Sequence, residues 1–323
     1  MKKIINQLIL ILITVSSLTF AQATIFSNGT GGGLWSSSST WLGGSVPTVN
    51  DDVFIAGTDS VYTTAGARCQ NLTVLSGGRF ATSVDTVQVV STLTLEDNAW
   101  CYNLTAEPNL PGYSYFLDPQ SYAVQIGSSG SVGSARNSEF GNLVIAKNNG
   151  CTPGADITIN GNLIVNMQAF NLVFRAARTQ SRTHTVYGNV YIYKGILSCV
   201  DIPDPTFVGI WNILGSVYVI DQGPTYLESR IGTFSSANAD GLGIINIAGD
   251  LIIQGGRLQA GTSSSHGFGT GINNLAGNLS MDINSAVSTN HEGPFAFNFV
   301  GSGTQNVNMD VRFQITQTNL YDT

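Results

Sequence analysis

Short runs in which apolar and polar residues alternate recur along the chain from about residue 24 onward. In these runs Val, Ile, Leu and Tyr alternate with Asn, Thr and Ser, which is the period of strands with one buried face. Beyond the N-terminal segment 1–23, no part of the sequence shows a sustained helical period. The pattern therefore predicts an all-β protein.

One unit recurs from Phe140 onward: an alternating run reaches a glycine, continues with Asn, Asp or Ser, and enters a second alternating run. The pivot glycines are Gly141, Gly161, Gly188, Gly215, Gly249 and Gly277, with a looser copy at Gly301. The intervals between them vary, the shortest from Gly141 to Gly161 and the longest from Gly215 to Gly249, which indicates one structural plan with loops of varied length. Glycine at the pivot permits either a positive φ or a close approach of two backbones, and the sequence leaves both open.

A unit with short strands and no helix cannot bury its own apolar face, so copies must stack. We predict a right-handed parallel β-helix of roughly nine or ten coils, extended backward through residues 93–95 and 71–74. The rival is a sandwich of antiparallel hairpins, but one of the few Asn-Gly pairs, Asn160-Gly161, lies inside a repeat rather than at a hairpin tip. The expected organisation is a signal peptide at 1–23, an N-terminal cap and first coil at 24–66, and β-helix repeats over 67–323.

The N-terminal segment 1–23 has the pattern of a secretory signal peptide. Lys2 and Lys3 precede an apolar stretch at 8–15, and Ala21-Gln22-Ala23 forms a small-residue cleavage site. The apolar stretch is shorter than the ~20 residues of a membrane span, and no later stretch is long and apolar enough. We expect cleavage near Ala23, no transmembrane span, and a secreted protein located outside the cell or on its outer surface.

Composition narrows the possible partners. Hydrophobic residues make up 42% of the chain, enough for a sizeable core, whereas charged residues make up only 10% against about 25% in ordinary domains. The formal net charge of −7 argues against a nucleic-acid partner, because phosphate recognition needs clustered Lys and Arg. The expected partners are extracellular polysaccharides or cell-surface components.

Two tryptophans and a paired aspartate follow the signal peptide in a defined order. The motifs are Trp35-Ser36, Thr40-Trp41, Gly43-Gly44, Val46-Pro47 and Asp51-Asp52-Val53-Phe54-Ile55. This order, over residues 35–74, resembles the opening of the eight-glycine domain and of large surface proteins that Gram-negative bacteria export by type IX secretion. Residues 299–305 resemble a further segment of those proteins. The resemblance implies that the tryptophans cap the first coil of a β-helix and that the aspartate motif leads into its first strand.

The chain departs from that family at its C-terminus. It stops at Tyr321-Asp322-Thr323 without the sorting domain expected of type IX cargo. Two explanations stay open: the sequence is a fragment, or the protein is not exported to the surface by type IX secretion.

Cysteine and histidine spacings indicate no metal or cofactor. Cys69, Cys101, Cys151 and Cys199 are widely separated along the chain, which excludes a C-x-x-C motif. We favour buried small side chains; the alternative is a pair of disulfides with three possible connectivities. His184, His266 and His291 share no metal-ligand spacing, so we expect structural or surface roles.

Acidic residues supply the only catalytic candidates. Asp201 and Glu228 lie at the same offset beyond the pivots Gly188 and Gly215, and corners of equal length would bring them within the ~5 Å that a retaining glycosidase uses. Asp204 lies nearby in a proline-rich segment. Solvated loop acids are the simpler interpretation and fold alone does not make an enzyme, so no catalytic residue is assigned.

An insertion at residues 105–120 interrupts the repeat and carries aromatic residues. Trp100, Tyr102, Tyr113 and Tyr115 are the ligand-binding candidates, because exposed rings can stack on sugars; alternatively they cover the apolar shaft beneath the loop. The expected function is structural or adhesive, with glycan binding as one form of adhesion. The alternative is a polysaccharide lyase or glycoside hydrolase that uses Asp201, Asp204 or Glu228.

Overall fold

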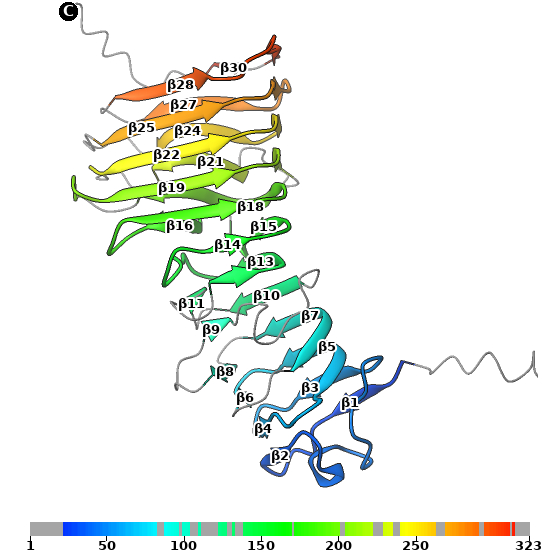
Figure 1. The fold of residues 1–323 in the computed structure, drawn as a ribbon. Coiled ribbons are helices and arrows are strands. Elements are labelled where there is room, and N and C mark those ends of the chain that lie inside the picture. Colours follow the sequence, from blue (N-terminus) through cyan, green and yellow to red (C-terminus); the bar gives the residue numbers. More distant parts are fainter. Residues whose placement is uncertain are drawn as a thin grey trace, which may run out of the picture.

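The computed structural model describes residues 22–82, 87–96, 99–103, 109–110, 122–127, 131–132, 138–169, 171–200, 204–221, 229–234, 240–262, 269–290, 294–310 and 312–313. Over these ranges the chain consists of strands and loops plus one short 3-10 helix, η1 (Ser38–Thr40). The strands stack into an elongated body in which spatial order follows chain order from one end to the other (Figure 1). The predicted all-β class is confirmed. Among the residues described, none forms a helix of the length and apolarity that a membrane crossing requires.

A long series of parallel strands runs through the whole body. Its members are β1 (Thr24–Phe26), β3 (Asp52–Ile55), β5 (Arg68–Val74), β7 (Gln88–Leu95), β10 (Tyr122–Gly127), β13 (Asn142–Lys147), β15 (Leu163–Asn166), β18 (Val190–Val200), β20 (Val217–Ile220), β23 (Leu251–Gln254), β26 (Leu279–Met281) and β29 (Val307–Met309).

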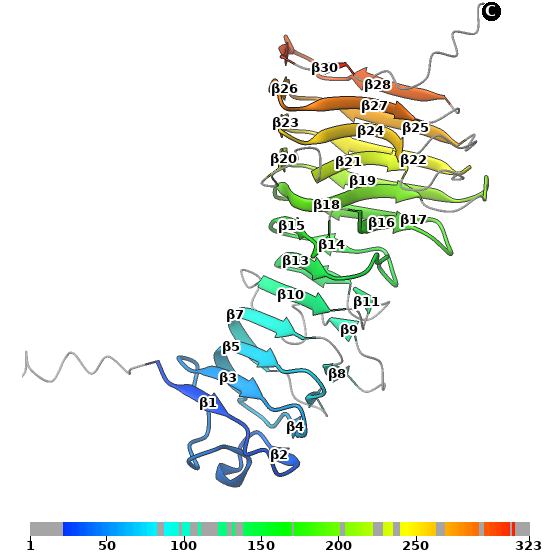
Figure 2. The ribbon, with the colours of Figure 1, turned by 180° about the vertical axis from the view of Figure 1, so that it is seen from behind.

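Two further series complete the C-terminal two thirds. The front series, which faces the viewer in Figure 1, contains β12 (Glu139–Phe140), β14 (Thr158–Ile159), β17 (Arg182–Val186), β19 (Val208–Ile213), β22 (Leu242–Ile247), β25 (Thr270–Leu275) and β28 (Phe295–Phe299). The third series, seen from behind in Figure 2, contains β16 (Val173–Ala177), the second half of β18, β21 (Ser229–Phe234), β24 (Arg257–Thr262), β27 (Ala286–Asn290) and β30 (Arg312–Phe313). β18 serves two series because Gly195, at a φ of 103°, bends the strand.

Smaller sheets lie toward the N-terminus. One contains β2 (Gly32–Leu34), β4 (Ser60–Tyr62), β6 (Arg79–Thr82) and β8 (Trp100–Asn103), and the other pairs β9 (Asn109–Leu110) with β11 (Ser131–Val132).

Every pairing between these strands is parallel. The rival sandwich of antiparallel hairpins is therefore excluded for the described strands. In the front series Val186 pairs with Ile213, and Ile213 pairs with Ile247. The sequence separations between these paired residues equal the separations between the pivot glycines of the same repeats. Leu72 pairs with Leu93, so the predicted backward extension is also confirmed.

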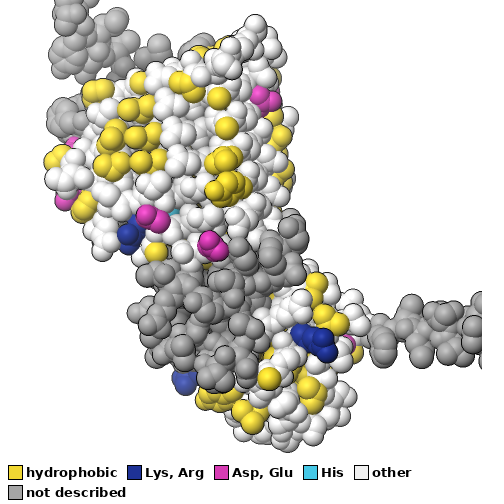
Figure 3. Space-filling view, in the orientation of Figure 1, with side chains coloured by type: hydrophobic (Ala, Val, Ile, Leu, Met, Phe, Trp, Pro, Cys, Tyr) yellow, Lys and Arg dark blue, Asp and Glu magenta, His cyan; other side chains and the backbone are white. Residues whose placement is uncertain are grey.

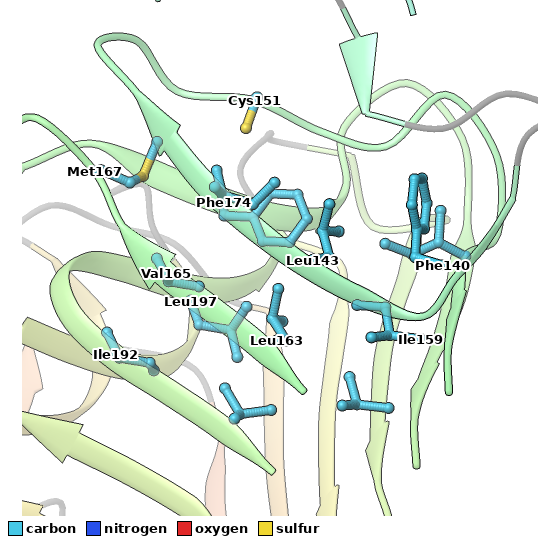
Figure 4. Close-up of a cluster of buried hydrophobic side chains, with 14 of the residues drawn as sticks. Phe140, Leu143, Cys151, Ile159, Leu163, Val165, Met167, Phe174, Ile192 and Leu197 are labelled. Carbon is cyan, nitrogen blue, oxygen red and sulfur yellow. The ribbon is translucent and has the colours of Figure 1, made fainter. Parts of the chain in front are cut away.

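The core is made by the inward residues of all three series. In β19 and β22 buried and half-buried residues alternate, with Trp211 and Ile245 inside. Figure 4 shows Leu163, Phe174 and Leu197, from β15, β16 and β18, directed into the same interior. Like residues lie over like residues in successive layers, so removing one apolar side chain would open a cavity between its neighbours.

The pivot glycines stack backbone on backbone. The amide of Gly188 donates to the carbonyl of Gly161 at 2.9 Å, and that of Gly249 donates to Gly215 at 3.0 Å. A Cβ on Gly188, Gly215 or Gly277 would lie within 3.0 Å of the carbonyl of the preceding layer. None of these glycines has a positive φ, so close approach, not a left-handed conformation, explains the residue type.

The residue after each pivot forms a second ladder. The side-chain oxygen of Asn162 accepts from the backbone amide of Asn189 at 2.9 Å, and Asn189 in turn accepts from Ser216 at 2.8 Å. Ser216 accepts from Asp250 at 3.0 Å, and Asp250 accepts from Asn278 at 2.7 Å. Asn, Ser and Asp can each occupy this position because each has a short side chain with an acceptor oxygen.

Aromatic residues close the N-terminal end of the body. Trp35 and Trp41 are each 2% exposed, their rings lie 5.1 Å apart, and the indole N–H of Trp41 donates to the carbonyl of Trp35. The ring of Phe80 on β6 lies 6.0 Å from Trp35. The two tryptophans therefore serve as core residues of the first layers.

Buried Asp59 fixes the glycine-rich segment beside these aromatic residues. Its carboxylate accepts from the backbone amides of Gly29 and Gly31, both at 2.8 Å. Burial raises the pKa of Asp59, but hydrogen bonds from Ser27, Gly29, Gly31 and Thr58 outweigh it, so the pKa lies below its ordinary value.

Replacing a stacked glycine tests the corner directly. We expect Gly215→Ala to lower the free energy of unfolding by about 2 kcal/mol, because the added Cβ meets the Gly188 carbonyl and the layers must separate. Gly303→Ala is the matched control, since nothing lies within 4 Å of its Cβ position, and we expect a change of less than ~0.5 kcal/mol. Denaturant titration of both variants measures the difference; equal effects would contradict the close-approach explanation.

Candidate functional site

The candidate pairing of Asp201 with Glu228 depended on corners of equal length after the two pivots. Asp201 and Glu228 lie outside the described residues, but the flanking register is known: Gly195 pairs with Ser229 and Val200 pairs with Phe234. Gly195 lies 7 residues after its pivot Gly188, whereas its partner Ser229 lies 14 residues after its pivot Gly215. The corners therefore differ in length, and the described neighbours of the two acids, Val200 and Ser229, stand at opposite ends of paired segments, ~16 Å apart along the strand.

Asp204 lies in a tight local turn. Its Oδ1 accepts from the Thr206 hydroxyl at 2.6 Å and from the Thr206 amide at 2.9 Å. These bonds lower the pKa of Asp204. A general acid must hold its proton near neutral pH, which requires a raised pKa, so this environment does not suit Asp204 to that role.

The aromatic candidates are only partly within the described chain. Trp100 and Tyr102 lie on β8, opposite Arg79 and Ala81 of β6, but their side chains fall outside the described residues, as do Tyr113 and Tyr115. Their ligand-binding role stays a prediction.

Three cysteines are buried and free: Cys69, Cys151 and Cys199. Burial raises the pKa of Cys151 to about 12, and it also raises those of Cys69 and Cys199. A reactive cysteine needs a lowered pKa and access to solvent, so the prediction of small buried side chains is confirmed for these three. The side chain of Cys101 lies outside the described residues. Among the described residues no group of three or more His, Cys, Asp or Glu is placed to hold a metal ion.

His184 is a core residue of β17. It is fully buried, its ring lies 4.6 Å from that of Trp211, and its Nδ1 accepts from the Ile157 amide at 3.0 Å. Nε2 therefore carries the proton and donates to the Ala176 carbonyl at 3.0 Å. Burial lowers the pKa of His184 to about 4, so the ring is neutral at ordinary pH and its role is structural.

The described chain carries one organised polar feature that the sequence analysis missed, a ladder of asparagines on the outer side of the front series. Asn246 donates its amide N–H to Oδ1 of Asn212 at 2.8 Å, Asn274 donates to Asn246 at 2.8 Å, and Asn298 donates to Asn274 at 2.9 Å. We call these four residues the asparagine ladder. They come from β19, β22, β25 and β28, which the parallel register brings side by side.

Apolar side chains flank the asparagine ladder on both sides. Ile210, Ile244 and Ile272 form a half-buried row two residues before it. Two residues after it, Ala248 and Ala276 lie between the larger, exposed Leu214 and Val300.

A shallow hollow of about 480 Å³ is lined by the two alanines and by three members of the ladder, Asn212, Asn246 and Asn274. It is bounded at its ends by Leu214 and Val300. The hollow exists because small side chains occupy the middle layers of a row whose ends carry large ones. We call the ladder and this hollow together the front groove.

The front groove is uncharged. β19, β22, β25 and β28 contain no Lys, Arg, Asp or Glu. Figure 3 shows two groups of hydrophobic side chains over these strands with other uncharged side chains between them. The side-chain hydrogen-bonding groups of the front groove are therefore neutral amides, and apolar side chains lie on both sides of them.

A signal for the asparagine ladder is present in the sequence. Asparagine stands three residues before the pivot glycine in four successive repeats, at 212, 246, 274 and 298 for pivots 215, 249, 277 and 301. Aligning the repeats on the glycine, rather than searching for catalytic residue types, would have found it.

No family model, no curated protein and no solved structure matches the chain.

The neutral state of His184 predicts a pH dependence of stability. Above pH 6.5 the ring is neutral in both the folded and the unfolded chain; below it the unfolded chain binds a proton that the folded chain takes up only near pH 4. The unfolding free energy should therefore fall by about 3 kcal/mol from this group as pH drops from 6.5 to 4.

Denaturant titrations between pH 4 and 8 measure this dependence. His184→Gln is the matched variant, because an amide can accept and donate as the ring does but does not titrate. The variant should show a shallower loss of stability over the same interval. Identical slopes for the two proteins would exclude His184 as the cause.

Proposed function

We propose that the chain is an exported, right-handed parallel β-helix that serves as a rigid structural and adhesive element outside the cell or on its outer surface. The observation that carries the proposal is the continuous parallel pairing of strands from β1 to β29, with stacked glycines in the layers from Gly161 to Gly249. Twelve long-series strands at ~4.8 Å per layer correspond to a shaft about 50 Å long.

The two corner ladders support stiffness. In each layer from Gly161 to Gly249 the pivot glycine and the residue after it both bond to the layer below. Bending the shaft at a corner would break both bonds together. A stiff shaft with loops of varied length is suited to display and attachment.

Export is supported by the N-terminal segment and by the resemblance of residues 35–74 to the eight-glycine domain and type IX surface proteins. The burial of Trp35 and Trp41 against each other agrees with the capping role that the resemblance implies. The enzymatic alternative, a polysaccharide lyase or glycoside hydrolase, is weaker because unequal corners remove the reason for pairing Asp201 with Glu228, and Asp204 is held in a local turn.

Retention on surfaces tests the adhesive role. The exported protein is incubated with insoluble polysaccharides and with isolated bacterial envelopes, and both bound protein and released reducing or unsaturated ends are measured. We expect retention on at least one surface without product, and equal retention for Asp201→Asn and Glu228→Gln. Product that disappears in either variant would establish the enzymatic alternative, and no retention on any surface would contradict the adhesive role.

Export is tested with the full chain in a Gram-negative host. We expect protein outside the cytoplasm with Thr24 as its first residue, and retention of an uncleaved form in the cytoplasm when Leu10→Arg and Leu12→Arg interrupt the apolar stretch. N-terminal sequencing of fractionated cells measures both. Uncleaved wild-type protein in the cytoplasm would contradict export.

A further inference from the structure

The asparagine ladder retains hydrogen-bonding capacity that faces outward. A primary amide has two N–H donors and an oxygen with two lone pairs. In Asn246 and Asn274 one N–H is donated to the preceding amide and one lone pair accepts from the following amide. Each amide therefore keeps one donor and one acceptor, and both residues lie on the outer side of the sheet, between buried neighbours. Hydroxyl groups, which both donate and accept, are the complementary ligand groups.

The absence of charge on β19, β22, β25 and β28 favours a neutral ligand. An anionic polymer desolvated on β19, β22, β25 and β28 would find no Lys or Arg to neutralise it. A cationic ligand would find no carboxylate. A neutral hydroxylated ligand loses no ionic hydration when it enters the front groove.

The spacing of the ladder favours a polymer. Adjacent strands lie ~4.8 Å apart, so the amides repeat at that interval along the body. A ligand that repeats at a comparable interval meets several amides in the same way. The pyranose rings of an extended polysaccharide are such a repeat, and each ring carries hydroxyls along its edge and C–H groups on its faces.

The apolar border fits the faces of these rings. Ala248 and Ala276 leave room between Leu214 and Val300, and aliphatic C–H groups of a sugar can fill it. Tyr187, which precedes Leu214 in the same row, is 54% exposed, and an exposed aromatic ring offers a stacking platform at the lower end of the groove.

We propose that the front groove binds a neutral polysaccharide chain that lies across the strands, along the asparagine ladder. This inference rests on the adhesive role proposed above and gives it a place and a ligand class. The amides of Asn246 and Asn274 bond to the hydroxyls of successive sugars, and the hollow over Ala248 and Ala276 receives their apolar faces.

A peptide strand is a poorer occupant. β19, β22 and β25 are each paired on both sides, so no backbone edge is free for an added strand in the middle of the face. A peptide lying across the ladder would leave many of its own amides and carbonyls without partners, at a cost for each.

Calorimetric titration of the full exported protein tests the inference. The probes are hexasaccharides of β-1,4-glucan, β-1,3-glucan and β-1,4-mannan, with hexagalacturonate as the acidic probe and a short Val-Thr repeat peptide as the protein-like probe. We expect at least one neutral hexasaccharide to bind, and the acidic probe and the peptide not to bind. Binding of the acidic probe or the peptide alone, or of no probe, would overturn the inference.

Two kinds of variant locate the contact. Asn246→Ala with Asn274→Ala removes the middle of the ladder, and Ala248→Leu fills the hollow at an exposed position without adding an aromatic ring. Each should weaken binding at least tenfold. The matched controls are Asn308→Ala and Ser280→Leu, on the long series, which should change affinity less than twofold, and thermal midpoints should show that all four proteins are folded.

The outcomes separate this inference from the proposed function. If the groove variants bind the hexasaccharide as tightly as the original protein, the front groove is not the site, while retention on surfaces still supports an adhesive role. If the original protein is retained on no surface, the adhesive role fails, whatever the variants do.

Discussion

The backbone contact between pivot glycines of successive layers is the constraint on which the rest of the structure depends. Only a residue without a Cβ lets the amide of Gly188 reach the carbonyl of Gly161 at 2.9 Å. That contact aligns the next residue so that its side-chain oxygen accepts from the layer above, as Asn162 does from Asn189. In the layers from Gly161 to Gly249, these two bonds at the pivot fix which residue of one repeat lies over which residue of the next.

Once the corners are aligned, the same register builds the inside and the outside of the body. Within the core it places Trp211 over Ile245, and on the outer side it places Asn212 beside Asn246. Because successive side chains of a strand point to opposite faces, the same register aligns the hydrophobic residues inside and the asparagines outside. A shift of one residue would bury the asparagines and expose the core, so the front groove can exist only while the corner contacts hold.

The sequence predicted the features that repeat locally and missed those that depend on loop length. Each repeat contains its own pivot glycine, from Gly141 to Gly277, between two alternating runs, so the parallel stack could be predicted from the sequence. The chain lengths that follow Gly188 and Gly215, before the next paired strand, do not repeat, and this difference removed the reason for pairing the candidates Asp201 and Glu228. The asparagine ladder was readable as a fixed offset from the glycine, but its four amides become one feature only when lateral pairing brings them together.

Stacking also explains why β19, β22, β25 and β28 carry no charged residue. A residue type repeated at one position lies ~4.8 Å from its copies, and like charges facing each other across strands are destabilising. Amides avoid that repulsion, because each can donate to one neighbour and accept from the other, as Asn246 and Asn274 do. Where an acid does enter a ladder, at Asp250, its neighbours are the uncharged Ser216 and Asn278. The neutrality of the front groove therefore follows from the architecture itself, and this is why the ligand proposed for it is one that presents hydroxyls and apolar surface rather than charge.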